Sequence, residues 1–364
     1  MAATLEIWNH IQRQLLPVLV DEIGPMTERD RQFVTVLALV PLDSFLEPYR
    51  WCGTGCPPHV RAWLVHAFIA KSVYEFPTTR ALIDALTARP TLRRLCGWES
   101  AWELPHECTF SRAFAAFSTD GLPQKLHAAM VCQQRGQRVV GHVSRDATAI
   151  DAREKPVRKP PAPPKVPAKR GRPAKGEQRP PPPPKRLDLQ GGRSLAENLA
   201  DLPSACDIGC KRNSKGHQEC WIGYKLHLDT IDGDIPVSAI LTSASVNDSQ
   251  VAIPLAQMTA QRMPVCFYDL MDSAYDAPQI HQYSRRLGHV PIIDPNPRRG
   301  EYIPLAPAEA QRFKQRTASE RVNSLLLERY GGTFVRVRGA KKVMAHLMFG
   351  LIALTAMQLY QLVV

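Results

Sequence analysis

Apolar residues recur at helical spacing through the first third of the chain. Between residues 29 and 130 they fall three and four positions apart, as in Phe33, Val36 and Leu37. That period places them on one face of a helix. The threonines at 78 or 79 and at 109 are suitable N-caps. With one more helix over residues 4–22, the pattern predicts an all-α N-terminal domain covering residues 1–130.

The period changes to two after residue 138. Residues 138–152 read as a strand with its turn, and residues 221–229 alternate polar and apolar side chains before the turn at 232–234. Later segments alternate in type, with strands expected at 235–243, 265–272 and 290–294 and helices at 249–261, 277–287 and 307–330. Such a mixture predicts an α/β fold with helices flanking a partly antiparallel sheet, formed by residues 138–152 and 194–364.

Residues 153–193 interrupt this domain with an insert of a different composition. They hold twelve prolines and thirteen Lys or Arg against three acidic residues, which leaves +10 of the net charge of +12. A segment so rich in proline and charge cannot bury a core, so we predict a disordered or polyproline II insert. Since the remaining chain is close to neutral, the insert is where a polyanionic partner is expected to bind.

The centre of the insert carries a short basic motif. Lys169-Arg170-Gly171-Arg172-Pro173 resembles the core of an AT-hook, in which two arginines flank a glycine in an extended chain. Such arginines can enter a narrow A·T minor groove. A generic electrostatic tether to DNA explains the same residues, and the sequence leaves both interpretations open.

Nine cysteines are scattered along the chain, and no export signal is visible at Met1–Trp8. An odd count in a long chain predicts reduced thiols in a cytosolic protein. Four soft ligands fall within fifteen residues: Cys206, Cys210, His217 and Cys220. Their spacing is not a standard one for zinc, so a structural zinc site and free thiols both remain open.

Residues 343–364 carry no formally charged side chain, and 22 residues are enough to span a bilayer. His346, Gln358 and Gln361 interrupt the apolar stretch. We expect a buried terminal helix and no membrane span.

Three acidic residues lie at the ends of two predicted strands and on a predicted helix, positions from which their side chains could meet. Asp146 and Asp272 each end an extended apolar run, and Glu320 lies on a predicted helix four residues after Arg316. Magnesium takes hard oxygen ligands and needs few carboxylates beside a substrate phosphate. We therefore predict that the three carboxylates converge on divalent cations. Arg316 and Glu320 share a helix face, so a plain surface pair is the alternative for these two.

Each acid has neighbours that could take its place. Asp151 competes with Asp146, which we favour because it adjoins the strand core. Asp269 and Asp276 compete with Asp272, and Asp276 suits a helix N-cap better. Glu328 competes with Glu320 on the same helix.

Four stretches together resemble the DDE transposases of bacterial insertion sequences that have a helical N-terminal domain. They are Ser144–Ile150, Trp221–His227, Asp272–Asp276 and Arg316–Asn323. The resemblance covers roughly residues 30–361 outside the insert, and the combination is more specific than any single stretch.

The family's late helix carries an aromatic residue, then Arg, Glu and Lys at fixed spacing. Three positions match here: Phe313, Arg316 and Glu320. Leu327 stands at the Lys position, which puts that basic contact in doubt, with Arg321 or Arg329 as replacements. Ala274 stands where the family usually has Gly two residues after the second Asp.

The resemblance implies an RNase H-like catalytic domain that cleaves and transfers DNA strands. It implies the acidic triad Asp146, Asp272 and Glu320, holding two Mg²⁺ ions, with Mn²⁺ as an alternative ion. The residues expected to contact DNA are Arg316, Arg321, Lys225, Lys169, Arg170 and Arg172.

The partners implied are double-stranded DNA, as the element's terminal inverted repeats and as target DNA, and a second copy of the chain on that DNA. The helical domain 1–130 would recognise the DNA ends. The expected location is the bacterial cytoplasm, in association with the nucleoid. A non-catalytic DNA-binding protein, as a decayed or domesticated transposase, is the alternative function; the presence of all three acids favours the enzyme.

Overall fold

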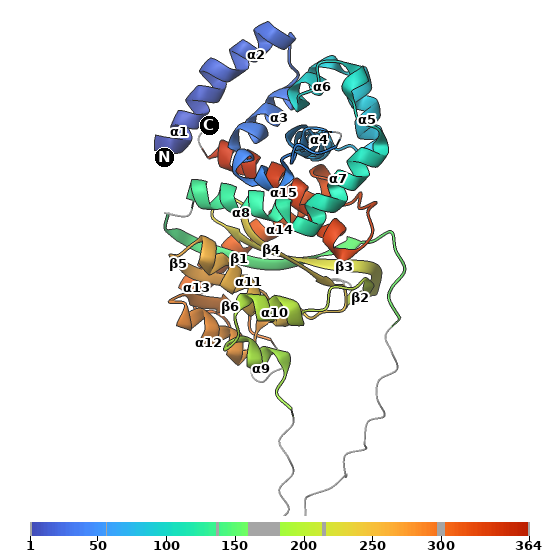
Figure 1. Ribbon diagram of the computed structural model, residues 1–364. Coiled ribbons are helices and arrows are strands. Elements are labelled where there is room, and N and C mark those ends of the chain that lie inside the picture. The colour runs from blue at the N-terminus through green and yellow to red at the C-terminus, as the bar shows by residue number, and fades with distance from the viewer. Residues whose placement is uncertain are drawn as a thin grey trace, which may run out of the picture.

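The computed structural model describes most of the chain as a helical region joined to a helix-covered sheet (Figure 1). The described residues are 2–55, 57–135, 138–158, 183–212, 216–296 and 303–362. The α/β fold predicted from sequence, with its mixed sheet, flanking helices and all-helical N-terminal region, is confirmed. The core of the predicted insert, with Lys169, Arg170 and Arg172, lies outside the described residues.

The helical region contains α-helices joined by turns and, in one place, by a longer segment. The helices are α1 (Ala2–His10), α2 (Leu16–Ile23), α3 (Glu28–Leu39), α4 (Arg61–Val73), α5 (Thr79–Ala88), α6 (Pro90–Cys96), α7 (Glu107–Asp120) and α8 (Leu122–Arg135). The longer segment lies between α3 and α4 and contains the 3₁₀ helices η2 (Asp43–Phe45) and η3 (Glu47–Tyr49). A π-helical turn, η1 (Ile11–Leu15), makes α1 and α2 one continuous helical run, as expected for residues 4–22. Thr78 caps α5 by accepting a hydrogen bond from the Ala81 N–H, whereas α7 begins before Thr109, with His106 as its N-cap.

Over the described residues, the sheet has six strands. They are β1 (Val140–Asp151), β2 (Asp207–Arg212), β3 (Gln218–Ile231), β4 (Ile235–Ser243), β5 (Cys266–Met271) and β6 (Val290–Ile293). The order is β2-β3-β1-β5-β6, with β4 also paired to β3. β3 is antiparallel to β1, β2 and β4, while β5 is parallel to β1 and β6. Thus β1 sits between an antiparallel and a parallel neighbour at the centre of the sheet.

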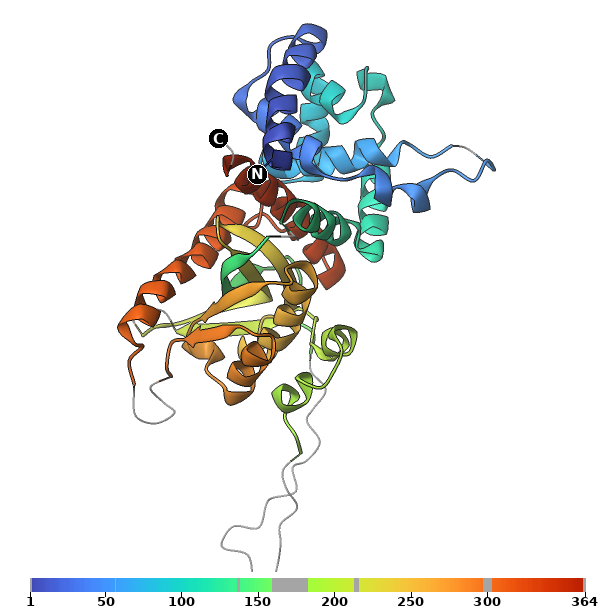
Figure 2. The ribbon, with the colours of Figure 1, turned by 90° about the vertical axis from the view of Figure 1, so that its left-hand side faces the viewer.

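Helices cover both faces of this sheet. They are α11 (Ser249–Arg262), α12 (Pro278–Arg286), α13 (Pro307–Phe313), α14 (Thr317–Arg329) and α15 (Ala340–Gln361). α8, α14 and α15 lie between the sheet and the helical region, and α11 and α12 lie on the opposite face (Figure 1). In Figure 2 the orange-red run of α13 and α14 extends along one side of the sheet toward the helical region.

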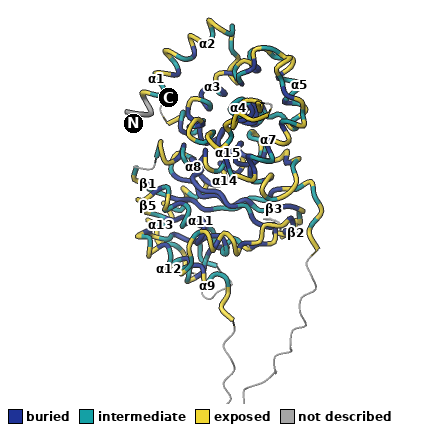
Figure 3. Tube along the Cα trace, viewed as in Figure 1, coloured by how far each residue is buried: buried dark blue, intermediate teal, exposed yellow. Residues whose placement is uncertain are grey.

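The C-terminal helix α15 joins the two parts of the molecule. It contacts α3, α4, α7 and α8 on one side and α14 and β4 on the other. One hydrophobic core therefore includes Phe68 of α4, Phe349 of α15 and Val143 of β1, and Figure 3 shows the buried path through α15 and the central strands. In the described part of the chain, α15 is the one helix long and apolar enough to cross a membrane, and 78% of its most apolar window is buried. It is thus the buried terminal helix that the sequence predicted.

The structure corrects two expectations about elements. Short helices α9 (Arg186–Gln190) and α10 (Leu195–Asp201) precede β2, and α9 falls inside the range 153–193 assigned to the disordered insert. α9 is held because Gln190, fully buried, donates a hydrogen bond to the Gln250 carbonyl (2.6 Å). The long helix expected over 307–330 is divided by the 3₁₀ turn η7 (Lys314–Arg316).

Candidate functional site

The two strand-end aspartates lie side by side. In the parallel pairing of β1 with β5, Arg145 is opposite Met271. Asp146 follows Arg145 and Asp272 follows Met271, so the two aspartates are neighbours at the same end of the two strands. Neighbouring strands are about 5 Å apart, and both carboxyl groups are partly buried. The predicted convergence of these two acids is therefore seen in the sheet register itself.

The carboxyl groups at this position are hard to ionise together. Burial raises the pKa of Asp146 to about 6, and the charges of Asp272 and Asp248 add to the rise. Burial also raises the pKa of Asp272, with a contribution from Asp248, although the Ala274 N–H donates a hydrogen bond to it (3.0 Å). Neighbouring carboxylates in a poorly solvated place favour a bound cation, because the cation removes their mutual repulsion.

Asp248 is a third carboxylate of this cluster, and sequence reasoning missed it. It directly precedes α11 and its side chain caps no backbone N–H there. Lys225 of β3 donates to it over 2.9 Å and to the Val246 carbonyl over 3.0 Å. Lys225, predicted to contact DNA, is therefore an ion-pair partner within the site, and its side chain is 16% exposed. The helix start expected at Ser249 was the available signal for Asp248.

Glu320 lies on the first turn of α14, which contacts β1. Its side chain is 49% exposed and accepts a hydrogen bond from Arg316. The positive charge of Arg316 in turn lowers the pKa of Asp146 and of Asp272, against the stronger effect of burial. Arg316 thus lies between the strand-end aspartates and Glu320.

Glu320 does not join the two aspartates as a preformed triad. Over the described ranges, no three His, Cys, Asp or Glu side chains are placed to hold one metal ion. Its role as third ligand stays a prediction, because a side chain engaged by Arg316 and open to solvent can change rotamer once a cation is present.

Asn323 is a second residue that sequence reasoning missed. Its amide Nδ2 donates to Asp146 Oδ2 over 3.0 Å, and the residue is 6% exposed. It lies three positions after Glu320, so both residues occupy neighbouring places on α14. The i,i+3 spacing from Glu320 was the signal that could have pointed to it. The hydrogen bond from Asn323 holds the Asp146 carboxylate in one orientation.

Replacing Asn323 by Ala should slow strand cleavage about 10- to 100-fold, because groups that orient a metal ligand contribute about that much. DNA affinity should stay unchanged. Electrophoretic mobility shift and cleavage assays on the same preparation measure the two effects. Ser324→Ala, an exposed neighbour on α14, is the matched control, and equal losses in both variants would remove Asn323 from the site.

The donor set fits a hard divalent cation. Asp146 and Asp272 offer carboxylate oxygens, and two buried oxygens beside them, Tyr275 Oη and Asn323 Oδ1, have no hydrogen-bond partner in the described structure. Buried polar atoms without a partner are rare and call for an ion or water. Oxygen donors without sulfur or imidazole are those that Mg²⁺ and Mn²⁺ prefer.

The raised pKa of Asp146 predicts a pH-dependent stability difference. Because its folded pKa of about 6 exceeds the value of about 4 in unfolded chains, ionisation destabilises the metal-free protein as pH rises from about 4 through 6. Asp146→Asn should therefore raise the free energy of unfolding at pH 8 by about 1–3 kcal/mol, discounted for partial exposure. At pH 4 the gain should vanish. Urea unfolding at both pH values, in EDTA, measures it; a gain independent of pH would contradict the assignment.

The other predicted DNA contact in the described chain, Arg321, lies at the edge of a neighbouring cavity of about 400 Å³. It donates two hydrogen bonds of 2.7 Å to Asp234 in the β3–β4 turn. Its guanidinium is 52% exposed. It reaches the surface beside α14 and remains a candidate contact.

The zinc site that the sequence left open is not formed. Cys210 and Cys220 face each other in the β2–β3 ladder and form a disulfide. Cys206 is buried apart from them, with its thiol directed at the Glu154 carbonyl. The expectation of reduced thiols is thus wrong for Cys210 and Cys220, because the antiparallel pairing brings their side chains into contact.

Two family models match the chain. One, described as a transposase domain, covers residues 21–116, and the other, described as a transposase DDE domain, covers residues 186–356. The second range contains Asp272 and Glu320, whereas Asp146 lies between the two ranges. No curated protein and no solved structure matches the chain.

Proposed function

We propose that this chain, which belongs to the DDE transposases of insertion sequences, cleaves DNA strands at the ends of its element and transfers them to target DNA. The observation that carries the proposal is the adjacency of Asp146 and Asp272 at one position of the β1–β5 register, in an environment that disfavours their ionisation. Proteins of this family use divalent metal ions.

The metal would be two Mg²⁺ ions, or Mn²⁺, which lower the pKa of the attacking water or DNA 3′-hydroxyl and neutralise charge on the phosphate. Asp146 and Asp272 would hold them, with Glu320 as the third ligand. Asn323 keeps Asp146 aimed at the shared position, since its donor lies 3.0 Å from the carboxylate.

Basic side chains on the same surface would place the DNA. The charge of Arg316 acts on both aspartates and lowers the pKa of each. Arg316 is therefore close enough to the site to hold a DNA phosphate that neighbours the reacting phosphate. Arg321 lies five positions along the same helical run and can contact the backbone. Lys225 acts differently: as the partner of Asp248, it neutralises one of the carboxylates.

The protein would act on the element's terminal inverted repeats, paired by two copies of the chain, in the bacterial cytoplasm at the nucleoid. The test is a cleavage assay with the purified protein and a linear duplex that carries the repeats flanking its coding region. Mg²⁺-dependent nicks with 3′-hydroxyl ends at the repeats support the proposal. No cleavage of the repeats under conditions in which they are bound would favour the non-catalytic alternative.

Deleting residues 159–182 should weaken DNA binding. That range carries seven Lys or Arg and one Glu, and each phosphate contact releases counterions. We expect a shallower dependence of log affinity on log salt, by up to about 4–6 slope units if most of the seven cations touch DNA. Fluorescence anisotropy over a salt series measures the slope.

An unchanged slope would show that the segment does not touch DNA. A second variant, Arg170→Ala with Arg172→Ala, separates the two modes left open by the sequence. Loss of preference for A·T-rich competitor DNA indicates minor-groove insertion, whereas a uniform loss indicates a tether.

A further inference from the structure

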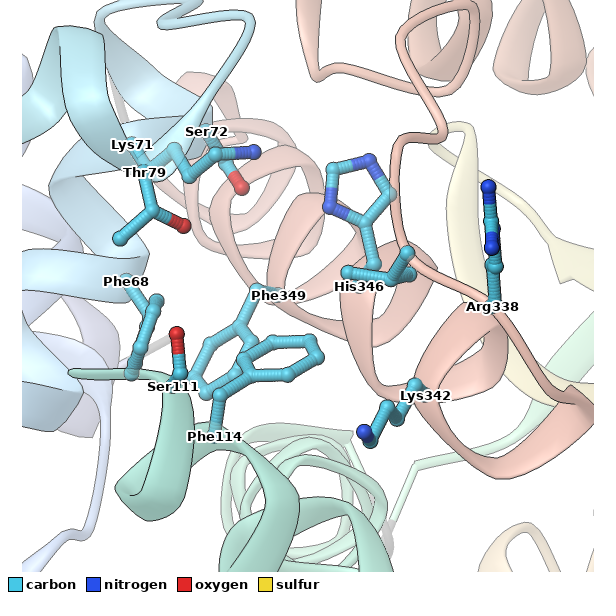
Figure 4. Close-up of a pocket in the computed structure, with 11 residues that line it drawn as sticks. Phe68, Lys71, Ser72, Thr79, Ser111, Phe114, Arg338, Lys342, His346 and Phe349 are labelled. Atoms are coloured by element: carbon cyan, nitrogen blue, oxygen red, sulfur yellow. The ribbon is translucent and has the colours of Figure 1, made fainter. Parts of the chain in front are cut away.

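A cavity of about 290 Å³ lies where the helical region meets α15 and the segment before it (Figure 4). Its lining comes from α4, α5, α7, α15 and residues 337–338. Those elements belong to both matched ranges, so the cavity exists only when the two parts of the chain are packed together.

The floor of the cavity is aromatic. Phe68, Phe114 and Phe349 converge there (Figure 4), with ring centroids 5.0 Å apart for Phe68 and Phe114 and 5.6 Å apart for Phe68 and Phe349. Phe114 and Phe349 are 6.2 Å apart. The planes of Phe68 and Phe114 are inclined by 61°, and each is inclined by 34° to Phe349. An apolar floor of inclined rings can contact a planar ring at its face or its edge.

The walls are cationic. Lys71, Arg338 and Lys342 line the cavity, and no acidic residue is among the lining side chains. Within the described residues, neither Lys71 nor Lys342 has an ion-pair or hydrogen-bond partner. Burial lowers the pKa of Lys71 to about 8, so it stays mostly charged at neutral pH and gains from an anion that replaces the lost water.

His346 faces Lys71 across the cavity as a neutral ring (Figure 4). Burial lowers its pKa to about 3, and the charge of Lys71 lowers it further. Its Nε2–H donates to the Gly331 carbonyl over 2.9 Å, so Nδ1 carries the lone pair and is an acceptor. The cavity therefore offers an acceptor and cations above an aromatic floor.

The basic insert begins at the same place. Arg338 donates to the Arg153 carbonyl over 3.0 Å, and Arg153 is the first residue of the insert. The volume is at the lower end for ligand pockets, which run from about 300 Å³, so it accepts a single nucleotide and excludes a duplex.

We propose that this cavity binds one unpaired nucleotide, with its base on the phenylalanine floor and its phosphate between Lys71 and Lys342. The choice of a nucleotide rests on the proposed action on DNA. The shared chemistry is a nucleoside monophosphate, whether it comes from a single-stranded DNA end or from a free nucleotide.

The test is protection of Lys71 from acetylation in the full wild-type chain. Its lowered pKa makes it reactive at pH 8, and mass spectrometry reports it separately from Lys341, an exposed neighbour of Lys342 that does not line the cavity. The probes are a blunt duplex, the same duplex with a short single-stranded overhang, and dTMP alone.

We expect the overhang to reduce acetylation of Lys71 about fivefold or more relative to the blunt duplex, while Lys341 is equally modified with both. Protection by dTMP alone to the same extent identifies a free nucleotide as the source. Equal protection by blunt and overhang duplexes would overturn the proposal, since it would indicate a plain backbone contact. So would no protection by any probe.

A variant pair gives a second readout. Lys71→Met keeps the length of the side chain without its charge and should remove the preference for overhang over blunt duplex, about tenfold in affinity, whereas Lys341→Met should keep it. A preference retained in Lys71→Met would also count against the proposal. The two inferences remain separable: if no duplex is bound, the action on DNA fails, and the dTMP arm still decides whether the cavity takes a nucleotide.

Discussion

Asp146→Asn, Asp272→Asn and Glu320→Gln should each reduce Mg²⁺-dependent strand cleavage at least about 100-fold, because a bound metal supplies several kcal/mol of transition-state stabilisation. DNA affinity should stay within about twofold, since most contacts are made to phosphates elsewhere. A cleavage assay on end-labelled duplex measures the first effect and anisotropy the second.

Matched controls come from the carboxylates that compete with the triad by sequence. Asp151→Asn lies on the same strand as Asp146, and Glu328→Gln lies on the same helix as Glu320; both residues are exposed. These controls should cleave normally. Retained activity in a triad variant would exclude that residue.

Glu320 and Asp248 can be separated by the same assay. The negative charge of Asp248 raises the pKa of both Asp146 and Asp272, so Asp248 lies close to them. Glu320 is the acid that the family resemblance assigns as the third ligand. Full activity in Glu320→Gln with none in Asp248→Asn would transfer the third ligand position to Asp248. The account expects the loss in Glu320→Gln.

Breaking the buried ion pair next to Asp146 should lower the free energy of unfolding by about 3–5 kcal/mol. Arg145 and Asp229 are 2% and 0% exposed and are joined by two hydrogen bonds of 2.8 Å. Thr259 donates a third hydrogen bond to Asp229 over 2.6 Å. Arg145→Met leaves the Asp229 charge buried without its partner, so chemical denaturation should show the loss, and the adjacent Asp146 should be displaced.

The double variant Arg145→Met with Asp229→Leu is the control, because removal of both charges leaves no uncompensated ion and should recover most of the loss. Asp269 is also buried, and its charge interacts with that of Arg145. In the double variant Asp269 keeps its hydrogen bond with His289 (3.1 Å). A double variant as unstable as Arg145→Met would show that packing, and not charge pairing, dominates there.

The sequence predicted five of the six strands of the described sheet, and the adjacency of the two aspartates, because these depend on local patterns, whereas β2 was not expected. Alternation located β3, the turn at residues 232–234 located β4, and the apolar runs that end in Asp146 and Asp272 are adjacent in the sheet. The positions that depend on contacts across the sheet were not predictable. Lys225 turns inward because Asp248 stands beside it, and nothing in its alternating strand marks that partner.

Short elements were missed for a related reason. Helix α9 is five residues long and follows a proline run, so it has too few turns to produce a helical period. Its order comes from contact with α11, through the Gln190 hydrogen bond to Gln250. The break at η7 likewise reflects packing, because the Gln315 carbonyl accepts a hydrogen bond from Ser144 of β1 (3.2 Å).

The location of bound manganese tests the central claim most directly. Crystals of the full-length chain grown with Mn²⁺ and measured at the manganese absorption edge should show an anomalous peak shared by Asp146 and Asp272, at about 2.1 Å from an oxygen of each. Glu320 should have turned from Arg316 toward that peak. A peak elsewhere, or none at these two carboxylates, would contradict the assignment of this site as the catalytic centre.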